Sequence, residues 1–92
     1  PVIVASTLYP GASPEVVERE VSRPIEKALN TIQGIKEITS TSREGQSQVR
    51  LQFELGVDVQ AMQPEVQAKV SRIRRSLPRD MEDPVIIRFD PN

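Results

Sequence analysis

The 92-residue sequence predicts an α+β fold in which a four-stranded antiparallel sheet carries two helices on one face. Three patterns point to this class. Two segments repeat apolar residues at intervals of three and four, which is typical of amphipathic helices. Each of these segments lies between strand-like runs. A regular alternation of apolar and polar residues after a short glycine-containing link is typical of a hairpin. The resulting order is β-α-β-β-α-β, and the length suffices for one domain with a modest core.

Residues 2–8 are the first predicted strand, because they are rich in β-branched and apolar side chains. Apolar side chains occur on both faces of its first half, which indicates a central position in the sheet. Pro10-Gly11 ends the strand, since this dipeptide is typical of a turn.

The first helix is expected to begin at Ser13-Pro14 and to run to about Gln33, with Gly34 as its stop. Serine is a favoured N-cap, proline suits the first helical position, and glycine often follows a helix end. Pro24 lies inside this helix, where a proline removes a hydrogen bond and costs about 3 kcal/mol. The apolar face nevertheless continues past it, at Val17, Val21, Ile25, Ala28, Leu29 and Ile32.

Residues 35–42 and 49–55 form the predicted hairpin, joined through a turn at residues 43–46. The second of these strands alternates regularly, so one of its faces should be buried and the other polar. The side chains expected to be buried are Val49, Leu51, Phe53 and Leu55. The polar ones, on the uncovered face of the sheet, are Arg50, Gln52 and Glu54.

Asp58 is a suitable N-cap for the second helix, but Pro64 should interrupt its first turns, so regular helix is expected only from near Gln63. Leu77-Pro78 closes this helix. Residues 84–90 form the last strand, whose flanking prolines favour an edge position. The apolar stripe of the helix comprises Val59, Met62, Val66, Val70, Ile73 and Leu77. Two right-handed crossovers around a central hairpin define the ferredoxin-like βαββαβ fold.

The composition excludes several function classes. The sequence has no cysteine or histidine, which excludes a thiol nucleophile, a histidine base and the usual zinc sites. A net charge of −1 and few aromatic residues disfavour binding of nucleic acid. The longest apolar run is far shorter than the roughly 20 residues that cross a bilayer. We therefore predict no catalytic residue, no cofactor, no metal site and no nucleic-acid partner. Met62 is expected to serve packing.

An ordered set of short motifs extends along essentially the whole chain. It comprises Tyr9-Pro10-Gly11-Ala12-Ser13, Val17-Glu18, Pro24-Ile25-Glu26 with Ala28-Leu29, Ile32-Gln33-Gly34-Ile35, Ser40-Thr41-Ser42 with Gly45, Phe53 with Gly56 and Asp58, Val66 with Lys69-Val70, Leu77-Pro78, and Phe89-Asp90-Pro91-Asn92. Together these motifs resemble the first periplasmic porter subdomain of resistance-nodulation-division (RND) efflux transporters. The resemblance is to the hydrophobe/amphiphile exporter type, which includes the acriflavin-resistance-protein-like pumps.

This resemblance implies that residues 1–92 are a single porter subdomain, a piece of a larger bacterial inner-membrane protein, and that this segment lies in the periplasm. Such transporters are proton-driven multidrug antiporters, so the segment would have a structural and conformational role in export rather than an enzymatic one. The implied partners are two further copies in a homotrimer, a periplasmic adaptor protein, an outer-membrane channel, and hydrophobic or amphiphilic small-molecule substrates. The isolated chain is expected to be a monomer or a weak oligomer.

The resemblance also implies that the second helix, at about residues 60–76, is a pore helix along the trimer axis. The side of this helix opposite its apolar stripe carries small residues, with two arginines further on. The candidate interface residues are Ala61, Pro64, Ala68, Ser71, Arg72 and Arg75. An alternative is that alanine is present only as a good helix former.

The basic cluster Arg72, Arg74, Arg75 and Arg79 at the end of this helix has two interpretations. Cations favourably meet the negative end of a helix dipole, and the acidic residues at 80, 82 and 83 could neutralise them. The alternative is an anionic partner.

Two other function classes are compatible with the fold. One is a stand-alone ligand-sensing or dimerising domain. The other is an acylphosphatase-like enzyme, which needs an anion-binding loop after the first strand with a well-placed arginine. The loop at residues 8–13 has no arginine, and Pro10 and Pro14 remove two backbone donors, so the enzyme is disfavoured.

Overall fold

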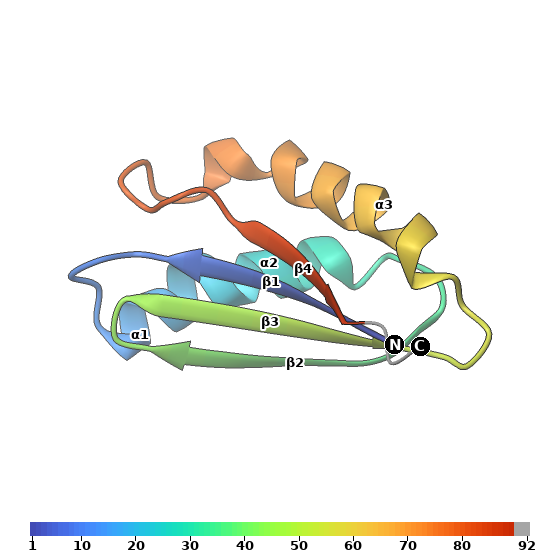
Figure 1. Cartoon of the computed structure of the whole chain (residues 1–92). Helices are drawn as coiled ribbons and strands as arrows, with labels where there is room; N and C mark the ends of the chain where they lie inside the picture. Colours follow the sequence, from blue (N-terminus) through green and yellow to red (C-terminus); the bar gives the residue numbers. More distant parts are fainter. Residues whose placement is uncertain (90–92) are drawn as a thin grey trace.

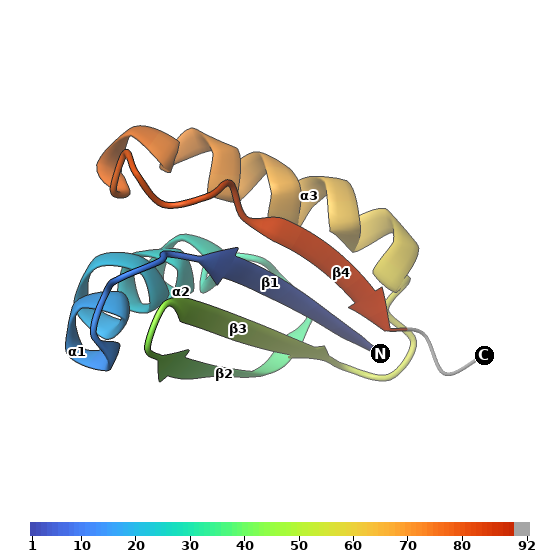
Figure 2. The same cartoon turned by 60° about the vertical axis from the view of Figure 1, so that its left-hand side comes forward.

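A four-stranded antiparallel sheet carries the helical segments on one of its faces (Figures 1 and 2). The structure, a computed structural model, describes residues 1–89. The strands are β1 (Val2–Leu8), β2 (Ile35–Arg43), β3 (Gln46–Phe53) and β4 (Val85–Phe89), in the sheet order β2-β3-β1-β4. The helical segments are α1 (Pro14–Val17), the π-helix η1 (Glu18–Ser22), α2 (Arg23–Leu29), α3 (Val59–Arg72) and the 3₁₀-helix η2 (Arg74–Ser76). The predicted ferredoxin-like α+β arrangement is confirmed. The last predicted strand residue, Asp90, lies outside the described residues.

The strand positions agree with the sequence. β1 lies between β3 and β4, so its predicted central position is confirmed, and β4 is an edge strand as its flanking prolines indicated. The β2–β3 hairpin closes through Glu44-Gly45. Antiparallel register places Ile3 opposite Leu51 and Ile86 opposite Ala5, all on the face that the helices cover.

The core lies between this face of the sheet and the two helices. The side chains from the strands alternate in burial, as expected for a sheet covered on one side. Met62 packs against the core and Met81 is buried, so both methionines serve packing. The buried apolar residues of the cluster are Ile3, Ala5, Val21, Ile25, Leu29, Ile32, Val49, Leu51, Phe53, Val59, Val66, Val70, Leu77, Met81 and Ile86.

The first helix is one run of three segments, α1, η1 and α2, with a π turn in its middle. Four apolar residues on it, Val17, Val21, Ile25 and Leu29, recur at a strict spacing of four, and all four are 0% exposed. On a straight α-helix each such step drifts by about 40°, roughly 120° in total. The π turn contributes an extra residue and returns the four side chains to one line. The π turn also places Pro24 in the first turn of α2, a position that suits proline.

The predicted end of this helix near Gln33 is wrong. The helix ends at Leu29, and the backbone N–H of Ile32 donates to the Leu29 carbonyl at 3.1 Å as the chain turns. This turn inserts Ile32 into the core at 5% exposure. Gly34, with φ of 91°, then leads into β2. Burial of Ile32 therefore ends the helix one turn before the glycine.

The predicted burial of Leu55 is also wrong, because this side chain is 92% exposed. β3 ends at Phe53, where its neighbour β2 begins, so a longer β3 would have no partner. The Glu54 N–H donates to the Gly34 carbonyl at 2.8 Å and the Val57 N–H donates to the Glu54 carbonyl at 3.2 Å. Leu55 therefore belongs to a turn, and the apolar–polar alternation that continues from Phe53 to Leu55 does not indicate burial of Leu55.

α3 begins at Val59, so the prediction that regular helix starts only near Gln63 is wrong. The Asp58 carboxylate accepts hydrogen bonds from the backbone N–H groups of Gln60 and Ala61, at 3.1 and 3.4 Å. Val59 is buried at 4% exposure, which attaches the first turn to the core. The N-cap at Asp58 and the burial of Val59 together stabilise the first turns of α3. Pro64 is accommodated inside the helix, and its side chain is exposed.

Gly34→Ala is expected to lower the free energy of unfolding more than Gly11→Ala does. Both glycines have positive φ, 91° and 86°, so alanine strains the backbone by about 1–2 kcal/mol at either position. A Cβ on Gly34 would lie 3.1 Å from Val57 Cγ2, whereas Gly11 has no atom within 4 Å of such a Cβ. The difference between the two variants in urea unfolding measures this crowding. Equal effects would show that Val57 moves aside freely.

Candidate functional site

α3 packs with one side on the core and leaves the other side open. Val59, Val66 and Val70 are its buried residues. Gln63 attaches the helix to the edge strand, because its Nε2 donates to the Ile86 carbonyl at 3.2 Å and its Oε1 accepts from Arg88 at 3.3 Å. The helix lies over β4 and contacts α2 in the same layer, as Figure 2 shows.

The six candidate interface residues are all exposed. Five of them lie on α3, within an arc of about 100° at 3.6 residues per turn, and the sixth follows on η2. Apart from the two arginines, their side chains are small or compact, so this side of the helix has little bulk. The set is Ala61, Pro64, Ala68, Ser71, Arg72 and Arg75.

The basic cluster at the end of α3 separates into two kinds of arginine. Arg74 is engaged by its surroundings. Its Nε donates to Asp83 Oδ1 at 2.9 Å, and its two terminal nitrogens donate to the carbonyls of Pro78 and Met81, at 3.0 and 3.1 Å. Arg72, Arg75 and Arg79 are exposed. Among the described residues, the neutralisation predicted from sequence is therefore seen at Arg74 with Asp83, while the two carbonyls hydrogen-bond the same guanidinium.

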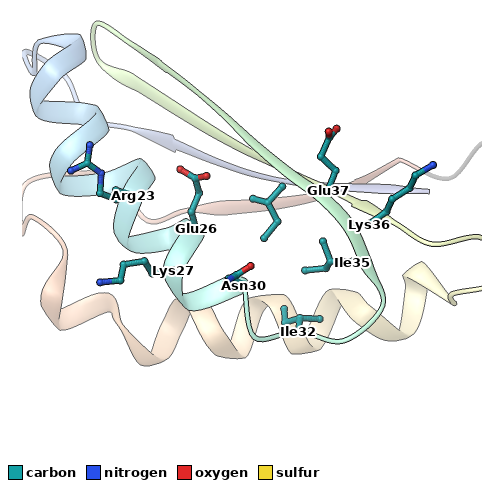
Figure 3. Close-up of a pocket in the computed structure, with 9 residues that line it drawn as sticks. Arg23, Glu26, Lys27, Asn30, Ile32, Ile35, Lys36 and Glu37 are labelled. Atoms are coloured by element: carbon teal, nitrogen blue, oxygen red, sulfur yellow. The ribbon is translucent and has the colours of Figure 1, made fainter.

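A groove of about 500 Å³ runs between α2 and the edge strand β2 (Figure 3). Three isoleucines give it an apolar part. Arg23, Glu26, Lys27 and Asn30 project from the helix side, and Lys36 and Glu37 from the strand side. Glu26 is already engaged, since its Oε1 accepts from Ser40 Oγ at 2.9 Å. The isoleucines are Ile32, Ile35 and Ile38. Sequence reasoning missed this groove because its two walls meet only in the folded chain.

The uncovered face of the sheet is divided into two halves. Along β3 it is polar, as predicted for Arg50 and Gln52, but along β4 and β1 it is apolar. The β4 side chains Val85, Ile87 and Phe89 are 58%, 39% and 55% exposed, and Val2 and Val4 of β1 lie beside them as half-buried register partners. The sequence analysis assigned polar side chains only along β3 and did not identify this apolar half. The alternation of Val85, Ile87 and Phe89 was the available signal.

A metal-binding site and an anion-binding site are two kinds of site that this fold could carry. Groups of three or more potential metal ligands are absent from residues 1–89. In the loop after β1, the Ala12 N–H donates to the Tyr9 carbonyl at 3.1 Å, so it does not point out toward an anion. Partial burial, followed by the carboxylates of Asp80 and Glu20, raises the pKa of the Tyr9 phenol above its ordinary value. No helix within residues 1–89 is both long and apolar enough to cross a bilayer.

Fold and surface together define a ferredoxin-like α+β domain that presents an open helix face and an open sheet face. Over its whole length, residues 1–92, the sequence matches the family model described as the AcrB/AcrD/AcrF family. The chain therefore belongs to the AcrB/AcrD/AcrF family of RND transporters. This is a family of inner-membrane transporters that work with partner proteins, and not a family of enzymes.

Proposed function

We propose that this chain is the first periplasmic porter subdomain of a proton-driven multidrug efflux transporter. It moves as a nearly rigid body while the transporter cycles, and α3 lines the central axis of a homotrimer as the pore helix. Export then proceeds through a periplasmic adaptor and an outer-membrane channel, with hydrophobic or amphiphilic molecules as substrates. The observation that carries the proposal is the family match over residues 1–92, together with the porter motifs that extend along the sequence.

The open side of α3 supports the assignment of this helix to an interface. Helix axes in contact usually lie 8–10 Å apart, and small side chains permit the shorter separations. Ala61, Ala68 and Ser71 provide such side chains, and all three are exposed in the isolated chain. A helix side that faces only water usually carries long charged or polar side chains. Symmetry-related copies of α3 packed around an axis would cover this side.

Ala68→Cys in the full-length transporter, in a background free of other cysteines, is expected to form a disulfide between neighbouring protomers under mild oxidation. Three copies of Ala68 near a three-fold axis bring pairs of Cβ atoms toward the 3.5–4.5 Å that a disulfide needs. Because one disulfide links two chains, a non-reducing gel should show a dimer band beside a monomer band.

Lys27→Cys is the matched control. Lys27 is also an exposed helical residue, but it lies on α2 and not on the open side of α3. We expect this variant to remain monomeric on the same gel. Absence of the dimer for Ala68→Cys, or equal dimer formation by Lys27→Cys, would contradict the placement of α3 at the axis.

A further inference from the structure

A chain of hydroxyl groups connects the π turn to the β2–β3 hairpin. Ser22, on the π turn, is 0% exposed, and its Oγ lies 2.7 Å from Ser42 Oγ of β2 and 2.7 Å from Ser47 Oγ of β3. Ser42 Oγ in turn donates to Glu18 Oε1 at 2.8 Å. Glu18 and Ser22 are the first and last residues of the π turn. We call Ser47, Ser22, Ser42 and Glu18 the hydroxyl chain.

The direction of every bond in the hydroxyl chain follows from proton counting. A serine hydroxyl has one proton to donate, and an ionised carboxylate only accepts. Ser42 uses its proton on Glu18, so in its bond with Ser22 it must accept and Ser22 must donate. Ser22 then has no proton left, so Ser47 donates to Ser22. The order is Ser47 to Ser22 to Ser42 to Glu18. Hydroxyls that are buried, as those of Ser22 and Ser47 are, cost free energy when they are separated from their partners.

The apolar stripe of the first helix requires an extra residue but does not determine where it lies. Val17, Val21, Ile25 and Leu29 could be aligned by a π turn at any point between the first and the last of them. In the structure, the Arg23 N–H donates to the Glu18 carbonyl, the i→i−5 bond that defines the π turn at this place. In a regular α-helix the same N–H would donate to the Arg19 carbonyl.

Two features could determine the position of the turn. Pro24 disfavours a regular helix directly before it, because its ring clashes with the carbonyl four residues earlier. The hydroxyl chain requires Glu18 and Ser22 to face the hairpin together. On a regular α-helix these two residues would still be offset by only about 40°, so the constraint acts through the short distances from Ser22 Oγ to Ser42 Oγ and Ser47 Oγ, which a rotation of Ser22 about the helix axis would lengthen.

We propose that the hydroxyl chain is a conformational constraint, independent of Pro24, that holds the π turn at Glu18–Ser22 and joins the first helix to the hairpin as one unit. Either constraint alone suffices, and removing both lets the extra residue move elsewhere between Val17 and Leu29, so that residues 18–22 become regular α-helix. This inference does not depend on the transport function proposed above. The unit formed by the first helix and the hairpin also includes the loop after β1, because the Gly45 N–H at the tip of the hairpin donates to the Ala12 carbonyl at 2.9 Å.

NMR couplings across hydrogen bonds test the proposal directly, since they identify the acceptor of the Arg23 N–H. In the isotope-labelled 92-residue chain and in Pro24→Ala, we expect coupling from the Arg23 nitrogen to the Glu18 carbonyl carbon. In the double variants Pro24→Ala with Ser22→Ala, and Pro24→Ala with Ser42→Ala, that coupling should be lost and coupling to the Arg19 carbonyl carbon should appear.

Thr41→Ala in the Pro24→Ala background is the matched control. Thr41 neighbours Ser42 on β2, but it is exposed and lies on the other side of the strand, so the Glu18 coupling should remain. Persistence of the Glu18 coupling in both double variants would overturn the proposal, because the hydroxyl chain would then hold nothing. Its loss in Pro24→Ala alone would also overturn it, because proline would be the sole determinant. The Ser42 variant changes a half-buried residue, so the test remains decisive if the Ser22 variant unfolds.

Discussion

Leu51→Ala is expected to lower the free energy of unfolding by about 2–5 kcal/mol. The Leu51 side chain is fully buried on β3, opposite Ile3 of β1, and it belongs to the core cluster. Truncation removes favourable burial and leaves a cavity that close-packed neighbours fill only in part. The change is measured as the shift of the urea unfolding midpoint of the 92-residue chain.

Leu55→Ala is the matched control, because it is the same substitution four residues later. Leu55 is 92% exposed in the turn after β3, so the free energy of unfolding should change by no more than about 0.5 kcal/mol. Sequence alternation alone predicts that the two substitutions have similar effects. A large loss of stability in Leu55→Ala would therefore support the sequence pattern and contradict the exposed turn.

Arg74→Ala is expected to lower the free energy of unfolding by about 1.5–3 kcal/mol. The main cause is the loss of the hydrogen bonds from Arg74 to two backbone carbonyls, and not the loss of its ion pair. The guanidinium donates to the carbonyls of Pro78 and Met81 and thereby holds the loop that buries Leu77 and Met81. Without Arg74, those carbonyls lose their donors and the loop loses its attachment to η2. Urea unfolding of the chain at moderate salt measures the effect.

Two substitutions separate the possible causes. Asp83→Asn removes the charge of the acidic partner, whose side chain is 87% exposed, so the loss should be only about 0–1 kcal/mol. Arg75→Ala removes an exposed arginine from the same short helix and should change stability by less than about 0.5 kcal/mol. If Asp83→Asn proves as harmful as Arg74→Ala, the ion pair and not the carbonyl bonds would be the main contribution.

The kinds and order of the elements were predictable because they depend on local patterns. The alternation from Val49 to Phe53 and the apolar stripe of α3 follow the two periods that a strand and a helix impose on any chain with one buried side. Asp58 and Ser13 cap their helices as such residues usually do. Only one common topology accommodates this order with a short hairpin, so the sheet followed from the order of the elements.

The errors lie where a neighbouring element decides the outcome. Leu55 continues the alternation, but the sheet has no strand left to pair with it. The first helix ends at Leu29 because the core accepts Ile32 from a turn. α3 starts at Val59 because burial of that residue and the cap at Asp58 outweigh the effect of Pro64. Each of these contributions comes from tertiary packing, which a local pattern does not contain.

The candidate interface on α3 shows the same division. Its six residues could be selected from helical periodicity, and the structure leaves all six exposed, but their role in a trimer stays a prediction. The groove beside α2 and the apolar half of the open sheet face were not predicted. The groove is lined by residues between 23 and 38, which are close in sequence but face one another only after the chain turns from α2 into β2. The apolar half of the sheet face joins β1 and β4, which are distant in sequence.

By itself, the sequence determined the number, type and order of the elements and the family, since these depend on period, capping and short motifs along the chain. Only the tertiary structure decided the π turn at Glu18–Ser22, its connection through Ser22 to the hairpin, and the surfaces left uncovered. The physical reason is that hydrogen bonding between buried side chains and the close packing of a core act between distant segments. Their energies exist only after those segments have been brought together.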